Sequence, residues 1–382
     1  MAVQPQVLEW ARRTAGLSVE QAAKRIGVRA DRIVEWEHGE VEPTIIQLRR
    51  AADAYDRPFA ALFVEAPPRN EEIFDLPDFR RPSTAASGES TSLRRAILRA
   101  RRQQDAIQEV IEEGTETPFV SPDVVLFDDG ASPADAGHVL REALGLNDVP
   151  SRVLLRPEDL LRHLVRVVER RGYLVIQVQN VSMDEMRGFS LGDGPAPVIA
   201  LNGADWPRGK IYTLLHELVH VGRRHSGLCD LSRDAASPEE RYCDEAAAAA
   251  LMPAKAFARA AQGVDRTRYA DLAGLAHGFG ASAESGLLRL VDLKLATWDE
   301  YQEMKPVFRE AYQKYKRDEK DANADKDVPI YYQLKARDLG RPFIRTILRA
   351  HDDGAISARD VAQLLEVSYD KLGKLAEVAG AA

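Results

Sequence analysis

One short motif constrains this chain more than any other feature: residues 216–220 read His-Glu-Leu-Val-His. The motif lies in a segment whose apolar residues recur at helical spacing, at Ile211, Leu214, Leu215, Leu218 and Val219. A helix brings residues four apart onto one face, so the imidazoles of His216 and His220 can reach one tetrahedral zinc ion at about 2.0–2.1 Å. Glu217 then lies beside the first ligand and can act as general base towards a water at the metal. The motif therefore predicts a zinc hydrolase site on a helix.

A zinc site of this kind needs a third protein ligand, and the spacing downstream of the motif selects its type. A metzincin would place a third histidine six residues after the second, but position 226 is serine and His225 is one residue short. The other common solution is a glutamate from a following helix. Glu240 precedes Asp244 by four residues, the spacing at which the aspartate can orient a ligand imidazole. Glu239 is the competing ligand, and the Asp244 spacing favours Glu240.

Substrate contacts are less strongly indicated. Tyr242 and His225 are candidates for stabilising the oxyanion, although helix packing is the commoner role for the first and a last-turn cation favoured by the helix dipole for the second. A strand ending near Leu201 is a candidate for pairing with an extended substrate segment, as edge strands do.

The N-terminal residues 4–66 have the pattern of five short helices. Ser18 is placed to cap the second helix and Gly27 to end it, and residues 30–37 follow as the next helix. In a helix-turn-helix this second helix of the pair enters the major groove. The residues expected to contact DNA are Gln21, Lys24, Arg29, Asp31 and Arg32.

The charge of this segment leaves its partner open. Residues 1–66 carry nine Lys or Arg against ten Asp or Glu. Because phosphate contacts dominate DNA affinity, such a module is expected to bind double-stranded DNA weakly, or to dimerise or dock a protein instead. A homodimer is consistent with this arrangement.

Composition and turn residues predict the division of the chain. We expect a helix-turn-helix domain at 1–66, a linker and connecting helix at 67–117, a metallopeptidase domain at 118–312 and a small helical module at 328–382. The charged run 314–327 is expected to be a linker. Strands are expected at 173–178, 188–191 and 197–201, the last two as a hairpin, so the fold class is α+β and rich in helix.

The composition of the chain also indicates its cellular compartment. No run of about 18 apolar residues is present, so a membrane-spanning helix is not expected. The chain has two cysteines, too few to suggest a disulfide scaffold, so the reducing cytoplasm is expected. Its net charge of −8 does not indicate nucleic-acid binding over the whole surface, so any DNA contact is expected from a local patch.

The motifs together resemble a known family. His216-Glu-Leu-Val-His220, Glu240 with Asp244, and Leu251-Met-Pro253 are similar to the ImmA/IrrE family of bacterial metallopeptidases. The segment from Gly16-Leu-Ser18 to Pro43-Thr44 resembles the XRE type of helix-turn-helix. The family often carries asparagine in place of Asp244 and an aromatic residue in place of Ala246, and neither departure removes a ligand.

This resemblance implies a zincin-like domain that uses Zn²⁺ to cut a protein substrate, typically a helix-turn-helix repressor or a regulator encoded nearby. Its setting would be bacterial stress response, mobile-element induction or toxin–antitoxin control. The alternative is a DNA-binding regulator or antitoxin-like protein that uses the metallopeptidase fold to bind a partner.

Overall fold

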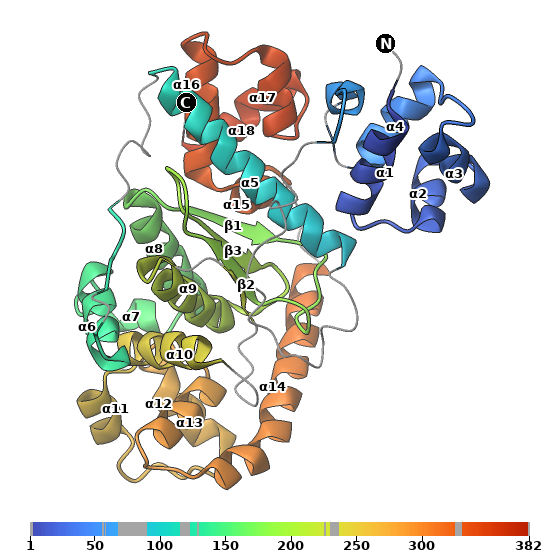
Figure 1. The fold of residues 1–382 in the computed structure, drawn as a ribbon. Coiled ribbons are helices and arrows are strands. Elements are labelled where there is room, and N and C mark those ends of the chain that lie inside the picture. Colours follow the sequence, from blue (N-terminus) through green and yellow to red (C-terminus); the bar gives the residue numbers. More distant parts are fainter. Residues whose placement is uncertain are drawn as a thin grey trace. The chain divides into compact units, whose positions relative to one another are not determined.

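The computed structural model describes residues 3–55, 57, 59–67, 90–114, 123–127, 130–224, 227–229, 237–324 and 331–380. These residues form two compact units, one of residues up to Arg99 and one of residues from Ala100 onward. The fold is α+β and rich in helix, as predicted (Figure 1). None of the helices in the described part of the chain has the length and apolar composition needed to cross a bilayer.

The first unit is a bundle of short helices. Its elements are α1 (Pro5–Thr14), α2 (Val19–Ile26), α3 (Ala30–His38), α4 (Ile45–Tyr55) and the 3₁₀ helix η1 (Phe59–Phe63). The predicted cap of α2 is present, because the Ser18 hydroxyl accepts the Gln21 amide and the Gln21 side chain accepts the Ser18 amide. Gly27, at φ 80°, ends the helix in the left-handed region. The buried core includes Leu8, Ile26, Ile33, Trp36, Tyr55 and Leu62.

A four-stranded sheet lies at the centre of the second unit. It contains β1 (Leu174–Val178), β2 (Gly188–Leu191), β3 (Val198–Asn202) and β4 (Gly227–Cys229), in the order β1-β3-β2-β4. The predicted hairpin is present, since β2 and β3 pair antiparallel, and β1 pairs parallel with β3. The expectation that the strand ending near Leu201 pairs with substrate is wrong, because β3 has β1 on one side and β2 on the other.

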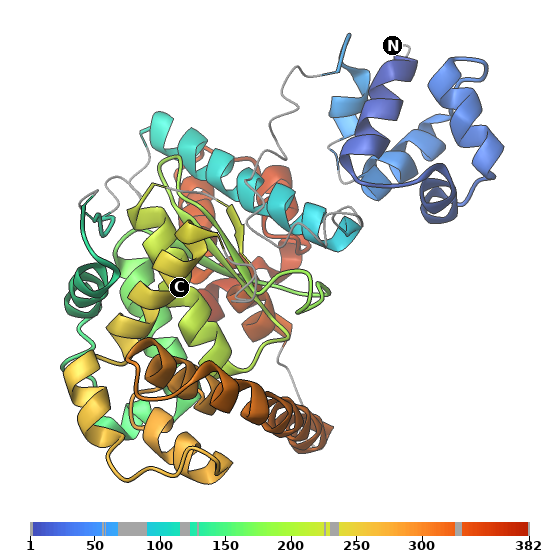
Figure 2. The same cartoon turned by 60° about the horizontal axis from the view of Figure 1, so that its bottom comes forward.

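Helices cover both faces of this sheet (Figures 1 and 2). On one face lie α8 (Pro157–Arg170) and α9 (Pro207–Gly222). On the other lie α15 (Tyr331–Leu339) and the second half of α5 (Thr91–Glu112), where the buried Gln103 amide donates to the Leu339 carbonyl. The C-terminal helices α16 (Arg341–Asp352), α17 (Ala358–Leu364) and α18 (Leu372–Ala379) continue from α15 and belong to the same compact unit.

The remaining helices of the second unit pack beyond α9. They are α6 (Pro133–Ala143), α7 (Ser151–Leu154), α10 (Pro238–Leu251), α11 (Ala254–Ala260), α12 (Tyr269–His277), α13 (Ala283–Asp292) and α14 (Trp298–Ala324).

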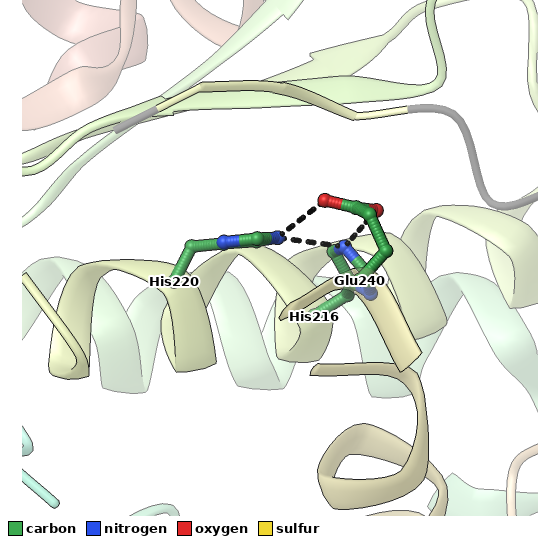
Figure 3. Close-up of side chains that lie close together, drawn as sticks. All are labelled: His216, His220 and Glu240. Atoms are coloured by element: carbon green, nitrogen blue, oxygen red, sulfur yellow. Dashed lines mark hydrogen bonds and ion pairs between the residues drawn. The ribbon is translucent and has the colours of Figure 1, made fainter. Parts of the chain in front are cut away.

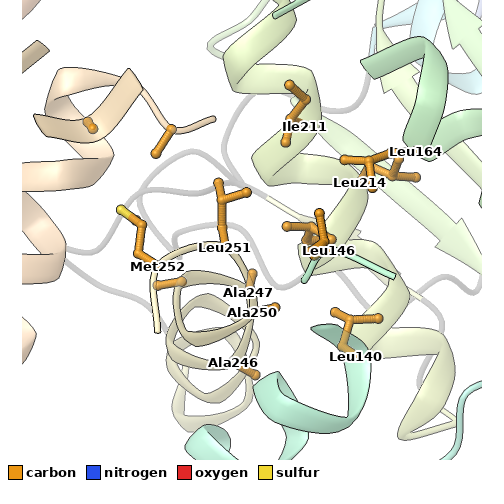
Figure 4. Packing of buried hydrophobic residues seen from close by; sticks show 14 of the residues in the cluster. Leu140, Leu146, Leu164, Ile211, Leu214, Ala246, Ala247, Ala250, Leu251 and Met252 are labelled. Carbon is orange, nitrogen blue, oxygen red and sulfur yellow. The ribbon is translucent and has the colours of Figure 1, made fainter. Parts of the chain in front are cut away.

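An alanine-rich helix allows the main core to close around α9. The five consecutive alanines 246–250 of α10 are buried, and α10 packs closely on α6 (Figure 4). A Cβ atom at Gly137 of α6 would lie 2.6 Å from the Ala249 Cβ atom, so both helices need small residues where they cross. Larger side chains, including Leu140, Leu164, Ile211 and Leu214, fill the space between these helices and the sheet. The packing holds α10 against α9.

The predicted linker at 314–327 is wrong over its first eleven residues. The helix α14 continues through this charged run to Ala324, and residues 325–327 lie outside the described part of the chain. Tyr312 and Tyr315 pack edge-on against Trp206, with ring centroids 5.5 Å and 5.7 Å away. Lys, Arg, Glu and Ala are also strong helix formers, so a charged run anchored at its start by two aromatic contacts remains helical.

Candidate metal centre

Helix α9 carries the histidine motif into the interior of the second unit. Pro207 occupies the first helical turn, where its missing N–H has no intrahelical partner to lose. His216, Glu217 and His220 are all fully buried. Polar side chains at such positions need partners, and these come from α10 and β2.

Two histidines and one glutamate converge in this interior (Figure 3). The Nε2 atoms of His216 and His220 are 3.1 Å apart. The Glu240 carboxylate of α10 lies 3.3 Å from the first nitrogen and 3.0 Å from the second. Ligands held tetrahedrally at about 2.0–2.1 Å from one zinc ion are about 3.3 Å from each other, so this donor set has the separations that a shared ion requires.

Asp244 contacts the His216 imidazole at the ring nitrogen that does not face Glu240. Its Oδ1 atom lies 3.1 Å from Nδ1 of His216, which leaves Nε2 of that ring directed at Glu240. The Tyr212 hydroxyl donates to the Asp244 carbonyl at 2.9 Å and ties α9 to α10 at the same level. Burial opposes protonation of His216, but the carboxylates of Asp244 and Glu240 outweigh it and raise the pKa of His216 well above the ordinary value.

Glu240 is placed by the start of its helix. Ser237 caps α10, and its hydroxyl accepts the Glu240 amide at 3.2 Å. Burial alone would raise the pKa of the Glu240 carboxyl, but His216 and His220 overcome this and lower the pKa to about 2. The carboxylate form that would bind a cation is therefore favoured.

Glu217 faces the sheet across a closely packed contact. A Cβ atom at Gly188 of β2 would lie 2.9 Å from Oε1 of Glu217 and 2.4 Å from Cγ2 of Thr213, so the strand can approach only with glycine there. Burial raises the pKa of Glu217, while the charges of His220 and His216, and to a smaller extent the Ser190 hydroxyl two residues along the same strand face, lower it in part. Sequence reasoning missed Gly188 and Ser190, although a glycine that opens a strand is an indication of close approach.

A second set of residues near His220 also competes for a metal ion. The competing ligand Glu239 pairs with Arg223, whose Nε is 2.8 Å from Oε1. Glu239 also forms a second compact group with His220 and Cys243, but burial raises the pKa of the Cys243 thiol far above its ordinary value. A neutral thiol is a poor zinc ligand. The set with Glu240 therefore fits zinc better.

Of the two proposed oxyanion residues, the structure describes only Tyr242. The Tyr242 hydroxyl donates to the Ala131 carbonyl at 2.9 Å, and Arg223 stacks over its ring at 4.1 Å. Tyr242 thus contributes to packing, the alternative that the sequence left open, and a role in substrate contact stays a prediction. His225 lies outside the described residues.

The residues expected to contact DNA occupy the surface of the first unit. Lys24, Arg29 and Asp31 are exposed, and Gln21 is exposed while completing the cap of α2. Arg32 is partly buried and pairs with Glu35 at 3.0 Å. The structure therefore brings these side chains to the α2–α3 surface, and their contact with DNA stays a prediction.

Comparisons with known proteins match two separate parts of the chain. Residues 169–291 match the model of a peptidase family, M78, described as the IrrE N-terminal-like domain, and residues 8–62 match a helix-turn-helix family. Neither curated proteins nor solved structures yield a match to the chain. The peptidase match runs from the end of α8 to α13 and contains the whole His216, His220 and Glu240 cluster. The chain thus carries an N-terminal helix-turn-helix domain followed by an IrrE N-terminal-like peptidase domain, the arrangement that its sequence resembles.

Proposed function

We propose that this protein is a zinc-dependent endopeptidase that cuts a regulatory protein, a helix-turn-helix repressor, in bacterial stress response, mobile-element control or a toxin–antitoxin system. One observation carries the proposal. Three buried donors, His216, His220 and Glu240, converge at 3.0–3.3 Å within a domain that matches a peptidase family.

The roles of the residues follow from their places. A zinc ion in this site would polarise the scissile carbonyl and lower the pKa of water. Glu217, one residue from His216 and buried, accepts the proton of the attacking water and returns it to the leaving amine. Its raised pKa brings the carboxyl nearer to the range in which a general base works at neutral pH. Asp244 keeps the His216 ring in its orientation throughout.

An extended substrate is proposed to lie along β4 rather than β3. In the described sheet β4 is the edge strand next to β2, the strand that covers Glu217. An edge strand presents backbone groups to which a peptide can add by β-augmentation. Such pairing would place the peptide beside the catalytic cluster without displacing a strand.

Metal content and cleavage test the proposal together. We expect close to one zinc per chain, measured by elemental analysis, in the wild type and in Glu217→Gln, and its loss in His216→Ala/His220→Ala. Candidate repressors encoded beside the gene are then incubated with each protein, and cut peptide bonds are mapped by mass spectrometry. Cleavage by the wild type alone supports the proposal. Failure of every variant, the wild type included, to bind zinc even after its addition would overturn it.

The second candidate function is that of a DNA-binding regulator whose peptidase domain binds a partner. The observation in its favour is the helix-turn-helix match at 8–62 with the exposed side chains of Lys24 and Arg29. Glu217→Gln separates the two, because a regulator would keep its effect on transcription with this substitution and a peptidase would lose it.

A further inference from the structure

We propose that residues 357–379 form a second helix-turn-helix, which binds double-stranded DNA. The segment contains α17 (Ala358–Leu364), a turn, the 3₁₀ helix η4 (Tyr369–Lys371) and α18 (Leu372–Ala379). The helix-turn-helix family match covers only residues 8–62, so this segment is assigned no function by the comparisons.

The segment repeats the pattern of α2 and α3 at a constant offset of 339 residues, the separation of Ser18 and Ser357. Both serines cap the first helix of the pair, and each hydroxyl accepts the amide of the residue three positions later. The matching apolar positions are Ala22 and Val361, Ala23 and Ala362, Ile26 and Leu365, Val28 and Val367, Ile33 and Leu372, and Trp36 and Leu375. In both segments these side chains are buried or partly buried.

The turn between the helices agrees as well. Gly27 of the N-terminal motif has φ 80°, and Glu366, at the matching position, has φ 53°. A left-handed residue is unusual without glycine, so its presence at the same position indicates the same turn. The Glu366 carboxylate is held by Lys335 of α15.

The exposed side chains of the 357–379 segment distinguish it from a second helix pair in the same unit, α12 and α13. The helices α12 and α13 also flank a left-handed glycine, Gly280 at φ 79°. None of the ten residues of α13, all of them described, is exposed, so α13 cannot enter a DNA groove. In contrast, Tyr369, Asp370, Gly373 and Lys374 are exposed at the start of the second helix of the 357–379 segment. These are the early residues with which a recognition helix contacts bases.

The buried side of α18 is firmly attached, which leaves only its polar face to a partner. Leu372, Leu375 and Ala379 are buried against the rest of the module. Arg345 donates to the Ala379 carbonyl at 3.1 Å and Arg341 to the Val378 carbonyl, so the helix end is held.

The exposed face of the segment has little of the apolar area that a protein interface needs as anchors. Its cations are Arg359, Lys371 and Lys374, all exposed, and Tyr369 is the one large aromatic side chain among the described residues of this face. Four exposed acids, Asp360, Glu366, Asp370 and Glu377, lie in the same segment. The net charge therefore does not favour DNA, and the proposal depends on the repeated helix-turn-helix pattern and on the exposed lysines at the start of the second helix. The acids keep the number of phosphate contacts small.

The test measures binding of the full chain to a fluorescent mixed-sequence duplex of about 30 base pairs by anisotropy at several salt concentrations. The background protein carries Lys24→Ala, Arg29→Ala and Arg32→Ala, which removes cations of the N-terminal motif. We expect this protein still to bind DNA. Adding Lys371→Ala and Lys374→Ala should weaken binding about tenfold per lysine near 0.1 M salt and reduce the log–log salt slope by about 2.

Two matched pairs control the result. Lys255→Ala with Arg259→Ala removes two exposed cations from α11 instead, and should leave affinity unchanged. A Cβ atom at Gly373 would meet nothing within 4 Å, so Gly373→Ala should bind as the background does, while Gly373→Glu should bind more weakly through its charge alone. Thermal unfolding verifies that all variants are folded.

Three results would overturn the proposal. The first is no DNA binding by the background protein, and the second is lysine variants with unchanged affinity and salt slope. The third is loss of a co-purifying protein in Gly373→Glu with DNA affinity unaltered, which would assign the face to a protein. None of these outcomes depends on peptidase activity.

Discussion

Glu169, in the last turn of α8, provides a pH-dependent test of how the C-terminal helices are attached. The side chain is only 9% exposed. Burial raises the pKa of its carboxyl to about 7, against partial compensation by the charges of Arg345 and Arg341 and by the Arg341 amide. Both arginines belong to α16, so the carboxyl reports on the contact between α8 and the C-terminal helices.

The sign and size of the effect follow from linkage. The folded pKa of about 7 lies above the ordinary value of 4.5, so the folded state holds this proton more tightly than the unfolded state. The contribution of Glu169 to stability is fully present below about pH 4.5 and is lost as the pH rises through about 7. With about 1.36 kcal/mol per pKa unit, the total loss is about 3 kcal/mol, of which about 2.5 kcal/mol falls between about pH 5 and pH 8.5.

The perturbation is Glu169→Gln, which keeps the shape and removes the titration. We expect the free energy of unfolding of the second unit, measured by urea denaturation of the full chain, to rise relative to wild type by about 2.5 kcal/mol more at about pH 8.5 than at about pH 5. Glu158→Gln, an exposed position of the same helix, is the control and should show no such pH dependence. The reasoning is refuted if the difference between wild type and Glu169→Gln is the same at both pH values.

Three further substitutions test the packing around the site and in the first unit. Gly188→Ala forces a Cβ atom to 2.9 Å from Oε1 of Glu217, so we expect a loss of about 1–3 kcal/mol in urea unfolding and a slower cleavage rate. Glu37→Ala breaks a nearly buried pair with Arg12, whose two nitrogens each lie 2.7 Å from a carboxylate oxygen, and should destabilise the first unit by roughly 3 kcal/mol in thermal unfolding. Asp244→Ala frees the His216 ring and should weaken zinc binding about 10–100-fold in a chelator competition.

Each of these substitutions has a matched control. Gly274→Ala places its Cβ atom in open space on α12 and should leave stability and cleavage unchanged, so an equal loss there would contradict the steric argument. Glu9→Ala removes an exposed pair with Arg13 and should change stability by less than about 0.5 kcal/mol. Asp244→Asn retains a hydrogen-bonding atom near His216; zinc affinity as low as that of the alanine variant would argue for a charge effect instead of positioning.

Local periodicity was enough to predict several parts of the structure. The helix around His216 and His220, the cap at Ser18 with the turn at Gly27, and the hairpin of β2 and β3 all depend on contacts between residues close in sequence. Their prediction succeeded because helix caps, helical faces and hairpin turns follow short-range rules. The selection of Glu240 over Glu239 came from a four-residue spacing, and its carboxylate does lie at the two imidazoles, while its role as a ligand stays a proposal.

Other features depended on contacts between distant residues. The internal position of β3 follows from its parallel pairing with β1. The charged run stays helical in part because α14 packs against Trp206 through Tyr312 and Tyr315. The place of Tyr242 depends on the Ala131 carbonyl, 111 residues away in sequence. No pattern within a helix or strand encodes these neighbours.

By itself, the sequence predicted which side chains could share a metal and placed the helix of the histidine motif, the capped turn at Ser18 and the hairpin of β2 and β3, because these properties are set within a few residues. Only the tertiary structure decided that Gly188 and Ser190 cover Glu217, that Tyr242 faces away from the cluster, and that α18 keeps an exposed face while α13 does not. The physical reason is that burial is a property of the packed core: which face of a helix or strand loses its water depends on elements far away in the chain.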